Sequence, residues 1–130
     1  MKVKEVMKRV KTIDSDSSVK KAAKIMSDAR IGSLVVLDGT KVVGIITERD
    51  ILSKVSATNK LPSKVKVSDI MTSKLIFIHP EDLIDDAVYL MLKYKIKKLP
   101  VMEGKELLGI LTSTDIVANS DEVGQFYFFG

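Results

Sequence analysis

Residues 44–51, GIITERDI, and residues 109–116, GILTSTDI, are two versions of one phrase, 65 positions apart. The similarity extends outward without a gap, since residues 10–52 align with residues 75–117 and 12 of the 43 paired positions are identical. Solenoids need about three or more repeats. Two copies with so long a period instead predict two half-domains packed as a pseudo-symmetric pair. The equivalent clefts between such halves suit small molecules.

The composition is that of a globular protein. Hydrophobic residues make up 45% and charged residues 29% of the 130 residues, which argues against disorder. A repeat of about 50 residues would be marginal alone, so we expect the two halves to complete each other's core. The sequence contains no apolar run of about 18 residues, which predicts no membrane span. Cysteine is absent, which excludes disulfides and, with no signal-peptide stretch, favours a cytoplasmic location.

The charge permits two interpretations. There are 21 Lys and Arg residues against 17 Asp and Glu residues, a formal net charge of +4. An excess this small is typical of a solvated surface. The lysine clusters could also attract phosphates or nucleic acid.

Each repeat predicts the same order of elements. An extended segment at residues 10–13 or 75–78 is followed by a helix, which has a polar start at Asp16-Ser17-Ser18 in the first copy and starts at Pro80-Glu81-Asp82 in the second. Two strands joined by a Gly-containing turn come next, at residues 34–46 and 99–111. A last helix begins at Thr47 or Thr112. The fold class predicted is mixed α/β (α+β), with each repeat reading β-α-β-β-α.

The closing phrase Gly-x-x-Thr-x-x-Asp can carry chemistry. A helix that begins directly after a strand offers free N–H groups to an anion, and a threonine hydroxyl can add a donor. Asp50 and Asp115 lie one turn further on, where a carboxylate could accept from the two hydroxyls of a ribose. The same residues also fit a helix cap, with threonine first and a carboxylate at the third position. Both roles stay open at this stage.

An enzyme is not expected. His79 is the only histidine, and without cysteine a zinc site or a catalytic triad has too few candidate residues. The glycines form neither a Walker nor a dinucleotide-binding motif. We therefore predict no catalytic residues, no metal and no cofactor.

The chain resembles the cystathionine-β-synthase (CBS) domain pair, or Bateman module. The resemblance rests on the two closing phrases and on two lead-in phrases, VKEVM at residues 3–7 and VSDIM at residues 67–71. It implies tandem CBS repeats with pseudo-two-fold symmetry, which we place at residues 1–58 and 59–120, and a tail at 121–130. The tail contains FYFF at residues 126–129, which could pack back on the core or anchor a partner.

The resemblance also implies the ligand-binding residues. In the family the lead-in of one copy faces the Thr-x-x-Asp of the other copy. It therefore implies one site from Val3, Met7, Lys98, Thr112 and Asp115, and a second from Val67, Met71, Ser33, Thr47 and Asp50. Further pocket positions are Ile13, Gly32, Ile78 and Lys97, with Arg49 in one copy where Thr114 stands in the other.

The function implied is regulatory. The family binds AMP, ADP, ATP or S-adenosylmethionine, and the lysine and arginine residues near the sites favour the nucleotides. We expect a module that passes its signal to an unidentified partner protein, and a homodimer formed through the helices. A nucleic-acid-binding protein and an assembly module with degenerate pockets are the alternatives.

Overall fold

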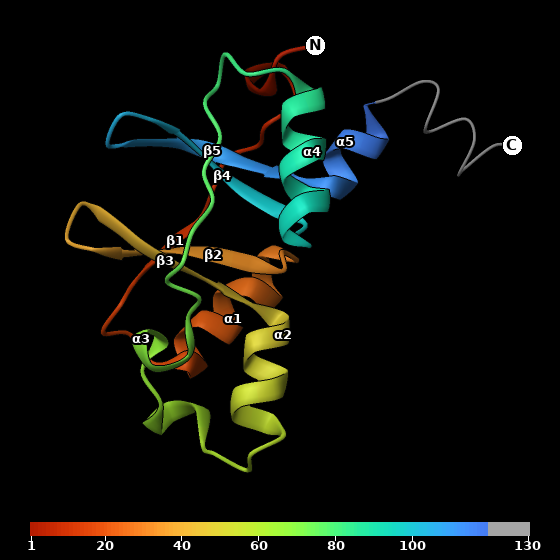
Figure 1. Cartoon of the computed structure of the whole chain (residues 1–130). Coiled ribbons are helices and arrows are strands. Elements are labelled where there is room, and N and C mark those ends of the chain that lie inside the picture. The colour runs from red at the N-terminus through yellow and green to blue at the C-terminus, as the bar shows by residue number, and fades with distance from the viewer. Residues whose placement is uncertain (120–130) are drawn as a thin grey trace, which may run out of the picture. The chain divides into compact units, whose positions relative to one another are not determined.

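The chain folds into two compact units, and each contains pieces of both repeats. The structure, a computed structural model, describes residues 1–119 (Figure 1). Unit 1 consists of Met1–Val10 and the chain from Ile76 onward, whereas unit 2 consists of Lys11–Leu75. The predicted mixed α+β class with a tandem repeat is confirmed. The aromatic residues 126–129 of the predicted tail lie outside the described residues.

Unit 2 is built on a three-stranded sheet. The strands β1 (Thr12–Asp14), β2 (Ser33–Asp38) and β3 (Lys41–Thr47) lie in the order β1-β2-β3, with β1 parallel and β3 antiparallel to β2. Helix α1 (Val19–Ala29) connects β1 to β2. Helix α2 (Glu48–Ile51) follows β3 directly and continues as one π-helical segment, Leu52–Ser56. The second lead-in phrase forms α3 (Val67–Ile70) after a 3-10 turn at Pro62–Lys64.

Unit 1 repeats this plan with fewer strands. Helix α4 (Ile84–Tyr94) precedes the antiparallel hairpin of β4 (Lys98–Glu103) and β5 (Glu106–Thr112), and α5 (Ser113–Ala118) follows β5 directly. The first lead-in phrase forms a 3-10 turn at Val3–Glu5. The extended segment expected at residues 75–78 is not a strand, because only Ile78 pairs with β4, through an isolated parallel bridge to Val101.

Local sequence signals explain most element boundaries. Ser18 caps α1 as predicted, and its hydroxyl accepts from the N–H of Lys21 at 3.1 Å. Gly39 and Gly104 have φ of +62° and +59° in the two hairpin turns, a conformation that favours glycine. The predicted start of α4 was wrong, since the helix begins at Ile84 with Leu83 as the N-cap.

Glu81 precedes α4 and pairs with two lysines near the start of the chain. Its carboxylate bonds to the ammonium groups of Lys2 and Lys4, each at 2.7 Å, and thus holds the N-terminal segment. These hydrogen bonds lower the pKa of Glu81 to about 2, and the bond to Glu81 raises the pKa of Lys4. The charge expected to serve the helix dipole serves this contact instead, and Asp85 and Asp86 occupy the first turn.

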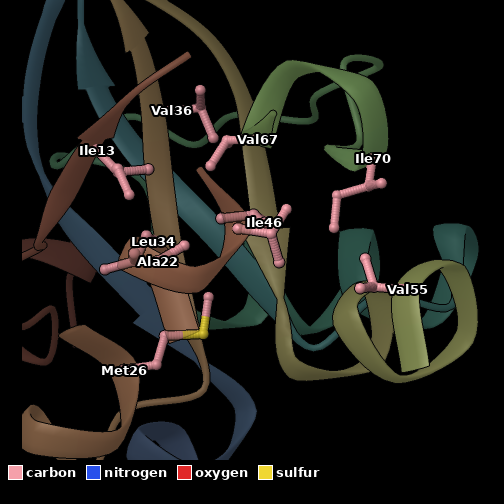
Figure 2. Close-up of a cluster of buried hydrophobic side chains, with 10 residues drawn as sticks. Ile13, Ala22, Met26, Leu34, Val36, Ile46, Val55, Val67 and Ile70 are labelled. Atoms are coloured by element: carbon pink, nitrogen blue, oxygen red, sulfur yellow. The ribbon is translucent and has the colours of Figure 1, made fainter. Parts of the chain in front are cut away.

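Each unit has its own hydrophobic core, and a lead-in phrase completes it. In unit 2, Val67 and Ile70 of α3 pack with residues of α1, β2 and β3, as Figure 2 shows. In unit 1, Val3 and Val6 pack with Ala87 and Leu111 in the corresponding cluster. The lead-in of each repeat therefore supplies core residues to the other repeat. Burial of apolar surface of this kind is the main stabilising contribution to folding.

The described part of the chain gives no sign of a membrane span. Among residues 1–119, no helix combines the length and the apolar character that crossing a bilayer would require.

A glycine in each closing phrase lets the lead-in approach the last strand closely. In unit 1, Lys8 and Ile110 exchange backbone hydrogen bonds of 2.9 and 3.0 Å. A Cβ atom placed on Gly109 would lie 2.6 Å from the carbonyl oxygen of Lys8. Thr72 and Ile45 exchange the equivalent bonds in unit 2, and a Cβ on Gly44 would lie 2.6 Å from the sulfur of Met71 and 2.9 Å from the Thr72 oxygen.

Gly109→Ala should therefore destabilise the fold. We expect a loss of about 1–3 kcal/mol in the free energy of unfolding, because the nearest obstacle is backbone and overpacking costs that much. Gly44→Ala should also destabilise the fold, because its Cβ would meet the backbone oxygen of Thr72 at 2.9 Å as well as the flexible side chain of Met71. Denaturant titration measures both, with Lys105→Ala as an exposed control that should change stability by about 0.5 kcal/mol or less. A fully stable Gly109→Ala variant would contradict the clamp between the lead-in and β5.

Candidate functional site

Thr112 and Asp115 interlock where β5 turns into α5. The backbone N–H of Asp115 donates to Thr112 Oγ1 at 3.1 Å, and Thr112 Oγ1 donates to Asp115 Oδ2 at 2.8 Å. The carboxylate is buried, with Asp115 only 5% exposed. Threonine at the N-cap position leaves the strand and begins the helix in one residue, so the sequence fixes this geometry locally.

Thr47 and Asp50 form the same arrangement where β3 turns into α2. Asp50 N donates to Thr47 Oγ1 at 3.2 Å, while the backbone N–H and the hydroxyl of Thr47 donate to Asp50 Oδ2 at 3.0 and 3.1 Å. Asp50 is 8% exposed. The capping role that the sequence left open is therefore formed in both copies, which fixes one carboxylate oxygen of each aspartate.

The free N–H groups expected at each helix start are largely used. Glu48 N donates to the carbonyl of Gly32 at 3.0 Å, and Ser113 N donates to the carbonyl of Lys97 at 2.9 Å. The N–H at the third helical position bonds to the capping threonine. The prediction of an open backbone anion site is thus wrong for two of the first three positions, because the chain entering β2 or β4 passes close to the helix start. An anionic group would need side-chain cations instead.

Each buried aspartate pairs with a lysine that sequence reasoning missed. The ammonium of Lys8 lies 2.7 Å from Asp115 Oδ1 in unit 1, and that of Lys54 lies 3.1 Å from Asp50 Oδ1 in unit 2. The Lys54 pair could have been found from its i, i+4 spacing. Lys8 has no such local signal, because only the bridge between the lead-in and β5 brings it near Asp115.

The two lysines come from different places in the repeat. Residue 72, which makes the bridge equivalent to that of Lys8, is a threonine. Residue 119, which aligns with Lys54, is an asparagine whose side chain donates to the carbonyl of Asp115 at 2.7 Å. Both copies therefore form a lysine–aspartate ion pair, but the lysine comes from a different position in each repeat.

The residues predicted for each site lie in one unit. Val3, Met7, Lys98, Thr112 and Asp115 all lie in unit 1, and their counterparts Val67, Met71, Ser33, Thr47 and Asp50 all lie in unit 2. Ser33 pairs with Thr47 across the first hairpin, and Lys98 pairs with Thr112 across the second.

The aliphatic candidates lie deeper than the polar ones. Val3 and Val67 are 0% exposed and belong to the two cores, together with Ile13 and Ile78. Met7 and Met71 are partly buried against Gly109 and Gly44, which leaves them as the accessible apolar side chains of the lead-in phrases. Arg49 and Thr114 are exposed at the second helical position, and Lys97 is exposed at the entrance to β4.

Comparison with protein families identifies the family to which this chain belongs. The family model of the CBS domain matches twice, at residues 3–57 and 67–122. The chain belongs to the CBS-domain family. The predicted family is thus confirmed, and each CBS match contains one lead-in phrase and one closing phrase.

Individual CBS proteins show the same likeness. A relative from Methanocaldococcus jannaschii is 31% identical over 91% of this chain, which spans 65% of that relative. The hexameric CBS-CP12 protein from bloom-forming cyanobacteria matches with a TM-score of 0.87 and 32% identity, over 96% of this chain and 71% of that protein. The CBS domain pair of protein MJ0100, solved with 5-methylthioadenosine and S-adenosyl-L-methionine, has a TM-score of 0.81 and 34% identity, over 91% and 94% of the two chains.

The interlocked cap should contribute to stability. Thr112→Val removes the hydroxyl that accepts from Asp115 N and donates to Asp115 Oδ2, so we expect a loss of about 0.5–2 kcal/mol. Thr112→Ser keeps the hydroxyl and should recover most of that loss. Thr40→Val makes the same chemical change in an exposed turn and is the matched control. Denaturant titration compares the free energies of unfolding of Thr112→Val, Thr112→Ser and Thr40→Val. Equal stability of Thr112→Val and the unchanged chain would show that the cap is dispensable.

Proposed function

We propose that this CBS pair is a regulatory module that binds an adenine-containing ligand, with AMP, ADP or ATP first and S-adenosylmethionine as the substitute. The observation that carries the proposal is the buried carboxylate of each closing phrase, which has one oxygen fixed by the cap and the other held by a lysine. A ribose offers two hydroxyl donors to such an acceptor. The protein MJ0100 neighbour, solved with two adenosine compounds, supports the same ligand class.

The proposed site lies within each unit. Asp115 would accept from the ribose in unit 1, and Asp50 in unit 2. Met7 or Met71 would contact the base, because these are the partly exposed apolar side chains that adjoin the closing strands. Lys98 or Ser33, opposite the capping threonine, would line the entrance.

The proposed mechanism is a shift of population. A ligand that contacts the lead-in of one repeat and the closing phrase of the other stabilises the arrangement in which both are docked. It can favour that state only by as much as its affinities for the two states differ. A partner protein that recognises the stabilised state would then receive the signal.

Nucleotide binding should raise the melting temperature by mass action. We expect a shift with AMP, ADP, ATP or S-adenosylmethionine and none with GMP in a thermal-shift screen. Asp115→Ala should weaken binding by roughly 10–150-fold, the range that follows from losing a charged hydrogen bond of about 1.5–3 kcal/mol. Titration calorimetry measures this, and Asp38→Asn, an exposed hairpin carboxylate, is the control. No shift with any adenine compound would refute the proposal and favour the assembly module.

We also propose a homodimer, with helix α4 as the contact. Val88, Tyr89 and Leu92 form an apolar face on α4 and are 37%, 62% and 74% exposed. The aligned residues on α1 are Ala23, Lys24 and Ser27, so the equivalent face of the other copy is small and polar. Exposed apolar patches of this kind mark interaction surfaces.

The charges of α4 fit pairing with a second copy. Asp85 and Asp86 lie in its first turn, and Lys93 lies in its last turn. Two copies of α4 packed antiparallel about a two-fold axis place each acidic end beside the basic end of the partner helix, so the surface is self-complementary. The hexameric CBS-CP12 neighbour indicates that proteins with this fold assemble.

Leu92→Glu should convert the dimer to a monomer, because the two-fold axis brings the new charge into an apolar contact twice. Ser27→Glu, the same change at the aligned position of α1, should leave the dimer intact. Sedimentation velocity distinguishes the two states. A Leu92→Glu variant that remains dimeric would exclude the α4 face as the interface.

A further inference from the structure

Both copies place a lysine on the buried aspartate, although the lysine comes from a different element in each. Lys8 directly follows the lead-in phrase and reaches Asp115 from another segment of the chain, whereas Lys54 lies one helical turn after Asp50. The aligned residues, Thr72 and Asn119, carry no charge. The shared feature of the two sites is therefore the ion pair and not the position that supplies it.

The lysines are more exposed than the carboxylates that they cover. The side chain of Lys8 is 69% exposed and that of Asp115 is 7% exposed, and the values for Lys54 and Asp50 are 45% and 12%. A ligand that approaches either carboxylate from solvent thus meets the ammonium group first. The cap already occupies Oδ2 of each aspartate, so the oxygen that a ligand would use is the one bonded to the lysine.

A ribose-binding carboxylate creates an electrostatic difficulty for a nucleotide. The phosphate of a nucleoside 5′-phosphate is only a few ångströms from its ribose hydroxyls, and like charges at that separation repel strongly in a partly buried site. The helix start offers few free N–H groups to offset this repulsion, because Glu48 N, Ser113 N and the third N–H of each helix are already bonded.

We infer that Lys8 and Lys54 are specificity-determining residues that select phosphorylated over uncharged ligands, an inference that rests on the proposed nucleotide function. When the ribose hydroxyls take Oδ1, the ammonium is released on its flexible stem and pairs with the phosphate of the ligand. The ammonium already in the site then balances one charge of the phosphate, while the ribose hydroxyls and the cap donate hydrogen bonds to the carboxylate.

The two sites should differ in how readily they make this exchange. The ammonium of Lys54 also donates to the carbonyl of Ile70 at 2.9 Å, which holds it at a second point. Lys8 is the more exposed lysine, and its anchor is the backbone bridge to Ile110, which leaves its side chain able to turn toward a ligand. Selection for phosphate should therefore be stronger in unit 1.

Methionine methyl NMR can read the two sites separately. Met7 contacts Gly109 in unit 1 and Met71 contacts Gly44 in unit 2, so each methyl signal reports on one closing phrase. Titrations with AMP and with adenosine give a dissociation constant for each site and each ligand. In the unchanged chain we expect AMP to bind more tightly than adenosine at both sites. The factor should be larger at the site that Met7 reports than at the site that Met71 reports.

Lys8→Met should reduce the preference for AMP over adenosine by at least tenfold at Met7 and leave it unchanged at Met71. Lys54→Met should reduce the preference for AMP over adenosine at the site that Met71 reports, by a smaller factor, and leave it unchanged at the site that Met7 reports. Lys8→Arg keeps the charge and should keep the preference, and Lys105→Met is an exposed control in the same unit. Lys8→Gln repeats the test if the methionine variant folds poorly.

Two results would overturn the inference. The first is an unchanged preference for AMP over adenosine in Lys8→Met and Lys8→Gln, whether both affinities stay the same or fall equally. If the unchanged chain binds either compound, that result would remove only the role of the lysines and leave the proposed function standing. The second is an unchanged chain in which neither compound shifts the signals of Met7 or Met71, which would overturn the proposed function as well.

Discussion

The whole arrangement depends on the reciprocal clamp between the lead-in of one repeat and the last strand of the other. Two backbone hydrogen bonds join Lys8 to Ile110, and two more join Thr72 to Ile45. These bonds form only because glycine precedes the strand residue and lets the backbone approach closely. The clamp carries apolar residues of the lead-in into each core, and in unit 1 it also places Lys8 beside the buried Asp115. Each core thus depends on this contact, and so does the ion pair of unit 1.

That contact explains why the closing phrase has its particular residues. Glycine gives room to the lead-in, threonine ends the strand and caps the helix, and aspartate completes the cap while keeping one oxygen available. Each residue has a structural role in the described part of the chain. In the proposed function the same phrase also binds the ligand, because the cap takes up only one oxygen of each carboxylate. A lysine pairs with the other oxygen.

The repeat is symmetric in fold but not in chemistry. The apolar face of α4 has a polar equivalent on α1, and the cation of each site comes from a different element. Duplicated halves preserve the residues that the backbone needs, such as the glycine and the capping threonine. Surface positions are under no such geometric constraint, so the two halves can acquire different partners and different preferences for a ligand.

The sequence by itself determined the repeat, most of the element order, the cap of α1 and the family, because these depend on local spacing. It left the capping role of Thr47 and Thr112 open. It also indicated which lead-in belongs with which closing phrase, through the family resemblance. Only the tertiary structure decided that Lys8 pairs with Asp115, that carbonyls of Gly32 and Lys97 take up the first helix N–H groups, and that Val3 and Val67 are core residues. Those facts depend on contacts between residues far apart in the chain, and no periodicity or spacing encodes the distance between such residues.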